Sequence, residues 1–221
     1  SIKMVENKKE NLEKRVNQHI NRIYEGILTS DELTQLTDSI LSKIIDSQNE
    51  LPDHITQEGE SWSERTIVLI TYADTIKDKN NLPINTINNF LHEHAKDFFE
   101  IVHVLPFFPS SSDTGFSVMD YYAIYHKFGQ WNDILKISKD FGVMADVVIN
   151  HASSKGKWFN NFIKGKGKGY DYFLNFDEKF DVSKVVRPRT SDLLNSFDTN
   201  AGEKFVWCTF SRDQVDYNFS K

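Results

Sequence analysis

Two apolar runs between residues 99 and 151 constrain the fold more than any other feature of the sequence. The first run spans residues 99–108 and the second 143–150, and a polar loop and a helical pattern at 132–141 lie between them. Both runs are rich in β-branched residues and end at turn residues, which is typical of strands buried in a parallel sheet. Parallel strands need a crossover connection, and crossovers are right-handed in nearly all proteins. The pattern therefore predicts a β-α-β unit.

A third apolar run extends this unit towards the N-terminus. Residues 66–71 form a short strand pattern, and residues 84–97 form a helical pattern with Pro83 near its start. The resulting order, β-α-β-α-β over residues 66–151, predicts an α/β fold with a parallel sheet and outer helices. Such a sheet is either open and doubly wound or the beginning of a barrel. After residue 151 the regular pattern ends, and we interpret residues 152–221 as an insertion with short strands at 185–189 and 204–210.

Residues 1–48 have a purely helical pattern, separated from the first strand by a polar linker at 49–64. Thr29 and Glu32 form a capping box between two helices, which predicts a helical hairpin. We expect the hairpin to pack on the main body, with a partner-binding arm as the alternative. The apolar stripes of the two helices are Leu12, Val16, Ile20, Ile23 and Ile27, and Leu33, Leu36, Ile40 and Ile44.

Composition narrows the function classes. A chain of 221 residues can bury a sizeable core, and its net charge of −6 argues against nucleic acid or an anionic membrane as the main partner. The single cysteine, Cys208, excludes an internal disulfide framework and favours the cytoplasm. No apolar run approaches 18 residues and the N-terminus is charged, so we expect neither a membrane span nor a signal peptide.

Polar residues follow the second and third predicted strands directly. Ser110 to Asp113 come after the first of them, and Asn150 and His151 after the other. Loops that leave the carboxyl ends of parallel strands build the ligand sites of α/β proteins. We therefore expect Asp113, Phe116 and His151 to meet over one ligand.

Each of these residues also has a structural interpretation that the sequence leaves open. His151 can donate a hydrogen bond to a ligand hydroxyl or serve as a satisfied structural histidine. Asp113 fits a turn as well as a site, and Phe116 would suit stacking under a sugar ring. Asp146, inside the third strand, is costly to bury unless an arginine or an amide pairs with it. Residues 120–122 could anchor the loop to the fold.

Other motifs argue against metal or nucleotide chemistry. His92 and His94 are two residues apart in a predicted helix, so they do not share a face, and no metal cluster stands out. The lysine- and glycine-rich stretch at 164–169 lacks the pattern of a phosphate-binding loop, and we interpret it as a solvated turn. We expect no metal and no organic cofactor.

Four ordered segments resemble a known family. DVVINH at 146–151 is similar to the first signature region of the α-amylase superfamily, glycoside hydrolase family 13. HVLPFFP at 103–109 followed by SSDTGFSVMDY at 111–121 resembles the branch that holds sucrose, sucrose 6-phosphate and glucosylglycerate phosphorylases. RPR at 187–189 and TFSRDQVDYN at 209–218 resemble segments of the same branch, so the similarity covers about residues 66–220.

The resemblance implies the N-terminal part of a (β/α)8 barrel, with about three strands and a B-domain-like insertion after the third. It implies transfer of an α-glucosyl unit to inorganic phosphate with retention. In this family Asp113 and His151 hold the glucosyl hydroxyls, and Phe116 provides an apolar platform. Gln214 matches a position near the same subsite, and Arg189 matches an arginine near the acceptor or phosphate, where a guanidinium suits an oxyanion.

The remaining implications concern structure near the site and the catalytic groups. Asp146 and Asn150 are expected to be structural; the counterpart of Asn150 binds calcium in true amylases, but this branch usually lacks that metal. Retention needs a nucleophile and an acid/base, which the family carries on its fourth and fifth strands, beyond Lys221. Asp216 is a poor nucleophile candidate. No catalytic residue is therefore expected in this chain, and it should be inactive alone.

The expected small-molecule partners are an α-glucoside and phosphate. Because the open edges of a three-stranded sheet attract other chains, we also expect either a complementing C-terminal half or self-association of this chain. The alternatives are a non-catalytic sugar-binding or interaction protein, and an unrelated doubly wound fold that binds a phosphorylated ligand. A reversal of strand order in the sheet would favour the latter.

Overall fold

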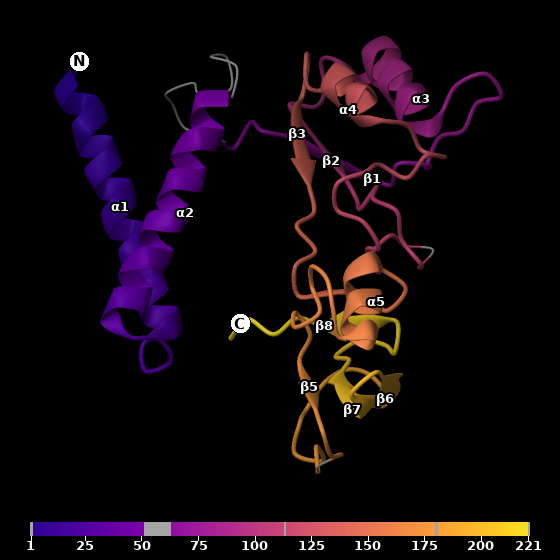
Figure 1. The fold of residues 1–221 in the computed structure, drawn as a ribbon. Helices are drawn as coiled ribbons and strands as arrows, with labels where there is room; N and C mark the ends of the chain where they lie inside the picture. The colour runs from indigo at the N-terminus through magenta and orange to yellow at the C-terminus, as the bar shows by residue number, and fades with distance from the viewer. Residues whose placement is uncertain (1, 51–62, 113, 180, 221) are drawn as a thin grey trace. The chain divides into compact units, whose positions relative to one another are not determined.

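The computed structural model describes residues 2–50, 63–112, 114–179 and 181–220 (Figure 1). For residues 2–9 and 48–50 only the backbone is described. The chain divides into two compact units, a helical one within Ser1–Ser61 and a larger one within Trp62–Phe219. Most of the predicted polar linker, residues 51–62, lies outside the described residues.

The first unit is the predicted helical hairpin, made of α1 (Ile2–Tyr24) and α2 (Ser30–Glu50). The capping box is confirmed: the Thr29 N–H donates to Glu32 Oε2 at 2.8 Å, and the Glu32 N–H donates to Thr29 Oγ1 at 3.4 Å. Ile20 is buried between the helices, whereas Ile23 and Ile27 are exposed within this unit, against the predicted stripe. A three-residue step places Ile23 about 60° around the helix from Ile20, and Ile27 lies in the turn after α1 ends at Tyr24. Whether the hairpin packs on the larger unit stays a prediction.

The larger unit begins with a parallel sheet of β1 (Val68–Thr71), β2 (Ile101–Val104) and β3 (Gly142–Ala145). The strands pair in sequence order, with no reversal among the three. Each strand is shorter than the apolar run that predicted it. Two connections cross between them, the first through α3 (Pro83–Phe90) and the π-helical turn η2 (Leu91–Ala95), the second through α4 (Trp131–Ile137) (Figure 1).

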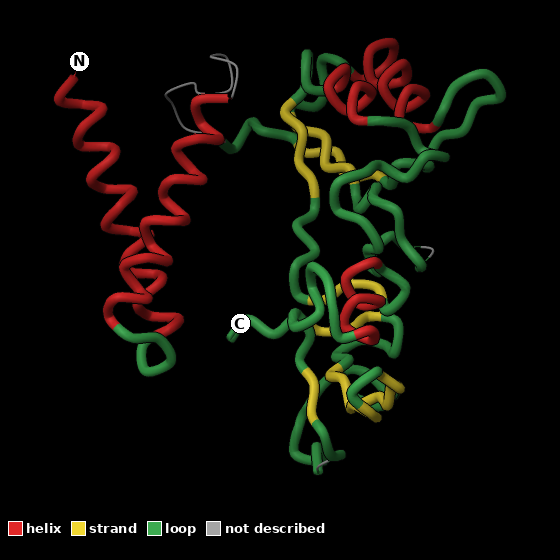
Figure 2. The backbone as a smooth tube through the Cα atoms, viewed as in Figure 1, coloured by secondary structure: helices red, strands yellow, loops and turns green. Residues whose placement is uncertain are grey.

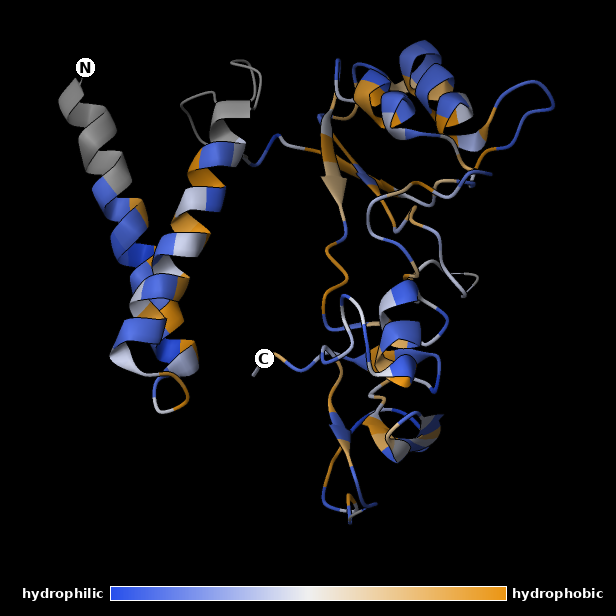
Figure 3. Ribbon diagram, in the orientation of Figure 1, coloured by the Kyte–Doolittle hydropathy of each residue, from blue (hydrophilic) through white to orange (hydrophobic). Residues whose placement is uncertain are grey.

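The two faces of this sheet have different surroundings. Val102 and Val104 are fully buried against apolar residues of α3 and α4, the orange patches on these helices in Figure 3. Ile70, His103 and Met144 stand in register on the opposite face, where Ile70 is 61% and Met144 42% exposed. The expectation of strands buried on both faces is therefore wrong for the described residues, because helices cover one face only.

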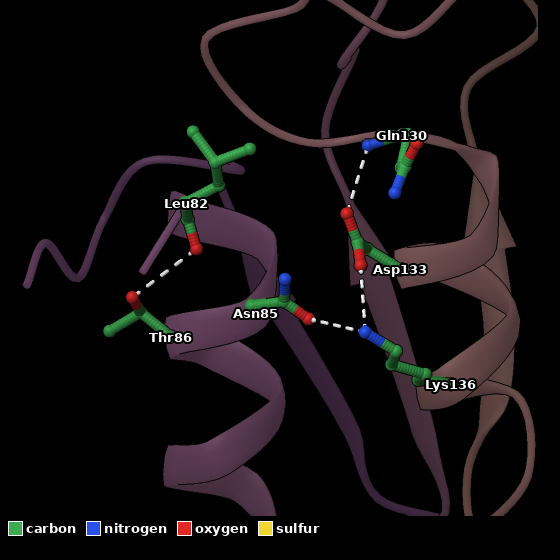
Figure 4. Close-up of polar contacts among 6 residues, drawn as sticks. All are labelled: Leu82, Asn85, Thr86, Gln130, Asp133 and Lys136. Carbon is green, nitrogen blue, oxygen red and sulfur yellow. Dashed lines mark hydrogen bonds and ion pairs between the residues drawn. The ribbon is translucent and has the colours of Figure 1, made fainter. Parts of the chain in front are cut away.

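A buried carboxylate joins the two covering helices. Asp133, at the third position of α4, accepts hydrogen bonds from the Gln130 N–H at 3.0 Å and from Lys136 Nζ at 3.0 Å (Figure 4). Lys136 Nζ also donates to Asn85 Oδ1 on α3 at 3.1 Å. One carboxylate thus caps α4 and, through the lysine, fixes it to α3.

The second part of the larger unit contains short antiparallel strands, which are among the yellow segments of Figure 2. One sheet pairs β4 (His151–Ser153) with β8 (Gln214–Asp216), and another has the order β5 (Asn175–Phe176), β7 (Gly202–Trp207), β6 (Leu194–Thr199). α5 (Lys157–Lys164) packs on them over a separate aromatic core. Among the described helices, none has the length and hydropathy to cross a membrane.

Three boundaries differ from the predictions. The run at 143–150 is not one strand: β3 ends at Ala145, residues 146–150 are irregular, and His151 opens β4 in a different sheet. Asp146 therefore follows a strand instead of lying inside one. Residues 185–189 form no strand, and the predicted strand at 204–210 is shifted to β7. Apolar content alone does not show where a chain leaves one sheet for another.

The Asp133→Ala substitution should lower the free energy of unfolding by about 2 kcal/mol, because it removes a helix cap and leaves the Gln130 N–H and the Lys136 ammonium without their acceptor. Urea unfolding measures the change. Asp97→Ala, at an exposed aspartate, is the control and should be close to neutral. Equal effects of the two substitutions would contradict the assigned role of Asp133.

Candidate functional site

A cavity of about 530 Å³ lies where the segment after β3 meets β4 and β8. It combines apolar and polar lining, and its size is in the range of small-molecule sites. Asp113 lies outside the described residues, although its neighbour Thr114 lines the cavity. The other sequence-predicted residues all line it: Phe116, Asp146, Asn150, His151, Arg189 and Gln214.

His151 is the buried centre of this group. It is the first residue of β4, where it pairs with Asp216 of β8. Its Nε2 lies 3.0 Å from the Phe116 carbonyl oxygen and 3.1 Å from Gln214 Nε2. Since a carbonyl only accepts, Nε2 carries the proton and donates to Phe116. Nδ1 then holds the lone pair, and it is buried without a hydrogen-bond partner among the described residues.

The surroundings keep this imidazole neutral. Burial lowers the pKa of His151, while the hydrogen bond to the Phe116 carbonyl and the charge of Asp216 act in the opposite direction. Burial is the largest of these effects. A neutral ring with a fixed tautomer offers a directed N–H donor at the cavity, and a ligand hydroxyl would compete with the Phe116 carbonyl for it.

The loop that carries Phe116 has a tightly constrained backbone. Ser110 and Val118 form a bridge across its base, and Gly115 has a φ of +83° at its tip. A Cβ atom at Gly115 would lie 2.4 Å from the Pro106 carbonyl oxygen. Only glycine fits this approach, and it turns the half-buried Phe116 towards His151.

Asp146 has a partner that the sequence did not suggest. His103 Nε2, in the middle of β2, lies 2.9 Å from Asp146 Oδ2, so the partner is a histidine instead of the expected arginine or amide. Asn150 is exposed, and its carbonyl accepts the Tyr217 N–H at 3.0 Å. No group of three or more potential metal-binding side chains occurs in the described part of the chain.

Phe210 belongs to the site, although the sequence analysis did not single it out. Its ring centroid lies 5.1 Å from that of His151, and the exposed Arg189 guanidinium lies 5.3 Å from the same ring. Arg187 holds the Arg189 loop by donating to the Thr209 carbonyl at 2.8 Å. The sequence did offer a signal for Phe210, because it stands four residues before Gln214. An aromatic residue in an irregular segment, however, belongs to a hydrophobic core more often than to a binding site.

The model of the family described as "Alpha amylase, catalytic domain" matches residues 97–221, more than half of the chain. The chain belongs to the alpha-amylase catalytic domain family. Relatives within this family include the glucosylglycerate phosphorylase of Allomeiothermus silvanus, 44% identical over 164 residues, which are 74% of this chain and 29% of the relative. The glucosylglycerate phosphorylase of Escherichia coli is 36% identical over 210 residues, 94% of this chain and 36% of the relative.

A solved structure agrees with this membership. The crystal structure of sucrose 6F-phosphate phosphorylase from Thermoanaerobacter thermosaccharolyticum superposes with a TM-score of 0.65 at 30% identity. The match covers 73% of this chain and 35% of that one. The chain thus spans about a third of the length of these alpha-amylase family relatives.

The Gly115→Ala substitution should destabilise the larger unit by about 2 kcal/mol, because alanine is strained at positive φ and its Cβ meets the Pro106 carbonyl. Gly165→Ala is the matched control: its φ is +63°, but nothing lies within 4 Å of the added Cβ. It should cost about 1 kcal/mol from the backbone alone. Thermal unfolding compares them, and a cost at Gly115 no larger than at Gly165 would refute the close approach.

The titration of His151 should make the free energy of unfolding depend on pH. The unfolded chain takes up a proton near pH 6.5, whereas the folded chain does so only at lower pH. The unfolded state therefore binds more protons than the folded state below pH 6.5. As the pH is lowered through this range, the free energy of unfolding should decrease by up to about 1.4 kcal/mol per pH unit.

Urea unfolding at pH 7.5, 6.5 and 5.5 measures this dependence. His151→Gln should flatten it between pH 6.5 and 5.5, because glutamine does not titrate. His126→Gln, at an exposed histidine, is the comparison. Equal slopes for wild type and His151→Gln would contradict a buried neutral imidazole.

Proposed function

We propose that this chain is the N-terminal part of a retaining α-glucoside phosphorylase and that its cavity holds the glucosyl unit of glucosylglycerate. The observation that carries the proposal is the grouping of six side chains, selected from the sequence alone, around one cavity of about 530 Å³. The choice of glucosylglycerate rests on relatives of that activity at 44% and 36% identity, against 30% for the sucrose 6F-phosphate phosphorylase structure.

We assign the glucosyl contacts to four residues. The Nε2–H of the neutral His151, which donates to the Phe116 carbonyl, is shared with a glucosyl hydroxyl, and Gln214 lies beside it at 3.1 Å. Phe116 provides an apolar surface for the sugar ring. Asp113, in the loop directly before Thr114, is assigned the acceptor role towards the hydroxyls on the basis of the family motif.

Arg189 is the residue we assign to the anionic end of the reaction. Its exposed guanidinium stacks over Phe210 next to the cavity, where it can pair with the carboxylate of glycerate or with phosphate. Stacking restricts the side chain. Arg189 Nη1 donates to the Pro188 carbonyl at 2.7 Å, which leaves the other N–H groups of the guanidinium for an oxyanion.

In the proposed reaction, the bond between the glucosyl carbon and the glycerate oxygen breaks and a bond to a phosphate oxygen forms. Glycerate leaves with a proton on that oxygen, and the incoming phosphate gives up one proton. Retention requires two carboxyl groups about 5 Å apart. The carboxylates near the cavity are already engaged: Asp146 pairs with His103, and Asp216 accepts the Thr209 hydroxyl at 2.6 Å. We therefore place the nucleophile and the acid/base in the part of the relatives that this chain does not span.

The open face of the parallel sheet supports a barrel. In a (β/α)8 barrel the helices cover the outside and the inward face packs against the other strands. Here α3 and α4 cover one face, whereas Ile70 and Met144 are exposed on the other and Val147 is 76% exposed after β3. We propose that the remaining strands of a phosphorylase barrel pack on this face, and self-association through it is the alternative outcome.

Isothermal titration of the chain with glucosylglycerate tests the cavity. We expect binding that His151→Ala weakens at least tenfold, because a hydrogen bond to a sugar hydroxyl and the packing around Phe210 are lost. His126→Ala should bind as wild type does. The absence of binding by the wild-type chain would contradict a preformed glucosyl site.

Glucose 1-phosphate formation from glucosylglycerate and phosphate tests the same proposal at the level of the reaction. The chain should be active only when co-expressed with the complementary two thirds of a glucosylglycerate phosphorylase. Activity of the chain alone would show that the bond-breaking groups are wrongly placed. A stable complex that binds glucosylglycerate but never releases glucose 1-phosphate would refute phosphorolysis.

A further inference from the structure

We infer that Asp213 is a positioning residue whose carboxylate connects the 110–118 loop to β4 and thereby fixes the geometry of the cavity. The inference rests on the proposed function, since it concerns the same site. Asp213 does not line the cavity; it lies behind it, one residue before Gln214, and acts through its neighbours.

Three serine hydroxyls converge on this half-buried carboxylate. Ser111 Oγ donates to Asp213 Oδ2 at 2.5 Å, and Ser154 Oγ donates to Oδ1 at 2.8 Å. The fully buried Ser153 Oγ lies 2.6 Å from Ser111 Oγ and 3.3 Å from Asp213 Oδ1. Hydrogen bonds to an ionised acceptor are about twice as strong as neutral ones, so this cluster is a strong local connection.

The direction of each hydrogen bond follows from what each group can donate. A carboxylate only accepts, so Ser111 uses its proton on Asp213 and can receive the proton of Ser153 at the shorter distance of 2.6 Å. Ser153 Oγ in turn accepts the Lys155 N–H at 2.9 Å. A chain of hydrogen bonds thus runs from the residues after β4 through two serines to Asp213, and all of it ends at one carboxylate.

The bonded residues are close in sequence to the site residues. Ser111 stands two residues before Asp113 and five before Phe116, Ser153 stands two residues after His151, and Asp213 precedes Gln214 directly. The carboxylate therefore holds together the three segments that supply the glucosyl contacts. Displacements of about 1 Å in such segments are enough to change binding or rate by a large factor.

Two serine substitutions separate positioning from general stability. Ser111→Ala removes the hydrogen bond between the loop and Asp213, and with it the acceptor of the Ser153 hydroxyl. Ser154→Ala removes a hydroxyl that donates to the same carboxylate, but the Ser154 N–H still donates to the Asp213 carbonyl at 3.0 Å. We expect Ser111→Ala to weaken glucosylglycerate binding about tenfold, the equivalent of one charge-assisted hydrogen bond, and Ser154→Ala to leave it within twofold of wild type.

A second measurement needs no sugar. The Nε2 proton of His151, observed by ¹H–¹⁵N NMR in the full chain, reports the contact with the Phe116 carbonyl. It should exchange with solvent about tenfold faster in Ser111→Ala than in Ser154→Ala. Only Ser111→Ala removes the side-chain link of the loop, which is then joined to β4 by the hydrogen bond from the Ser153 N–H to the Val118 carbonyl. Asp213→Ala should give the same acceleration, and Asp213→Asn, which keeps one acceptor oxygen, should restore part of it.

The outcomes are distinguishable from those that test the proposed function. Equal exchange rates in Ser111→Ala, Ser154→Ala and wild type would overturn the positioning role, whether or not the chain binds glucosylglycerate. Ser111→Ala can alter the imidazole signal even if neither the wild-type chain nor the variant binds glucosylglycerate. That result would leave Asp213 as a positioning residue and refute the proposed ligand. If Asp213→Ala does not fold, the serine pair decides the question.

Discussion

The hydrogen bond from His151 Nε2 to the Phe116 carbonyl joins two parts of the chain that belong to different sheets. Phe116 lies in the loop after β2 of the parallel sheet, and His151 opens β4 of an antiparallel pair. The bond needs a neutral imidazole, which burial provides, and a loop held in one conformation, which Gly115 and the Asp213 cluster provide. The cavity has its shape because these conditions hold together.

The two halves of the larger unit contribute to the cavity in different ways. The parallel sheet and its helices form a rigid support, built from apolar packing and the buried Asp133. The antiparallel half contributes Gln214, Arg189 and Phe210, which reach the cavity from segments far along the chain. The halves are joined by polar contacts, such as the hydrogen bond from the Tyr121 hydroxyl to the His151 carbonyl, and by the stacking of Tyr121 on Trp158.

Much of this arrangement could be predicted from the sequence. The β-α-β-α-β order of elements followed from hydrophobic periodicity and crossover length, and the capping box at Thr29 followed from local chemistry alone. The break at Ala145 could not be predicted, because Asp146 to Asn150 continue the same apolar alternation after the chain has left the sheet. The His103 partner of Asp146 depends on the register of two strands, and Phe210 on a distant turn. Such contacts are set by tertiary structure, which local pattern does not encode.

The one-sided cover of the parallel sheet also gives the chain an order of assembly. Strands β1 to β3 and the helices between them make contacts over short stretches of sequence, so this layer can close early during synthesis from the N-terminus. Its bare face, with Ile70 and Met144, then stays exposed to solvent until another strand or chain covers it. Until that happens, the exposed apolar surface is a binding site for chaperones.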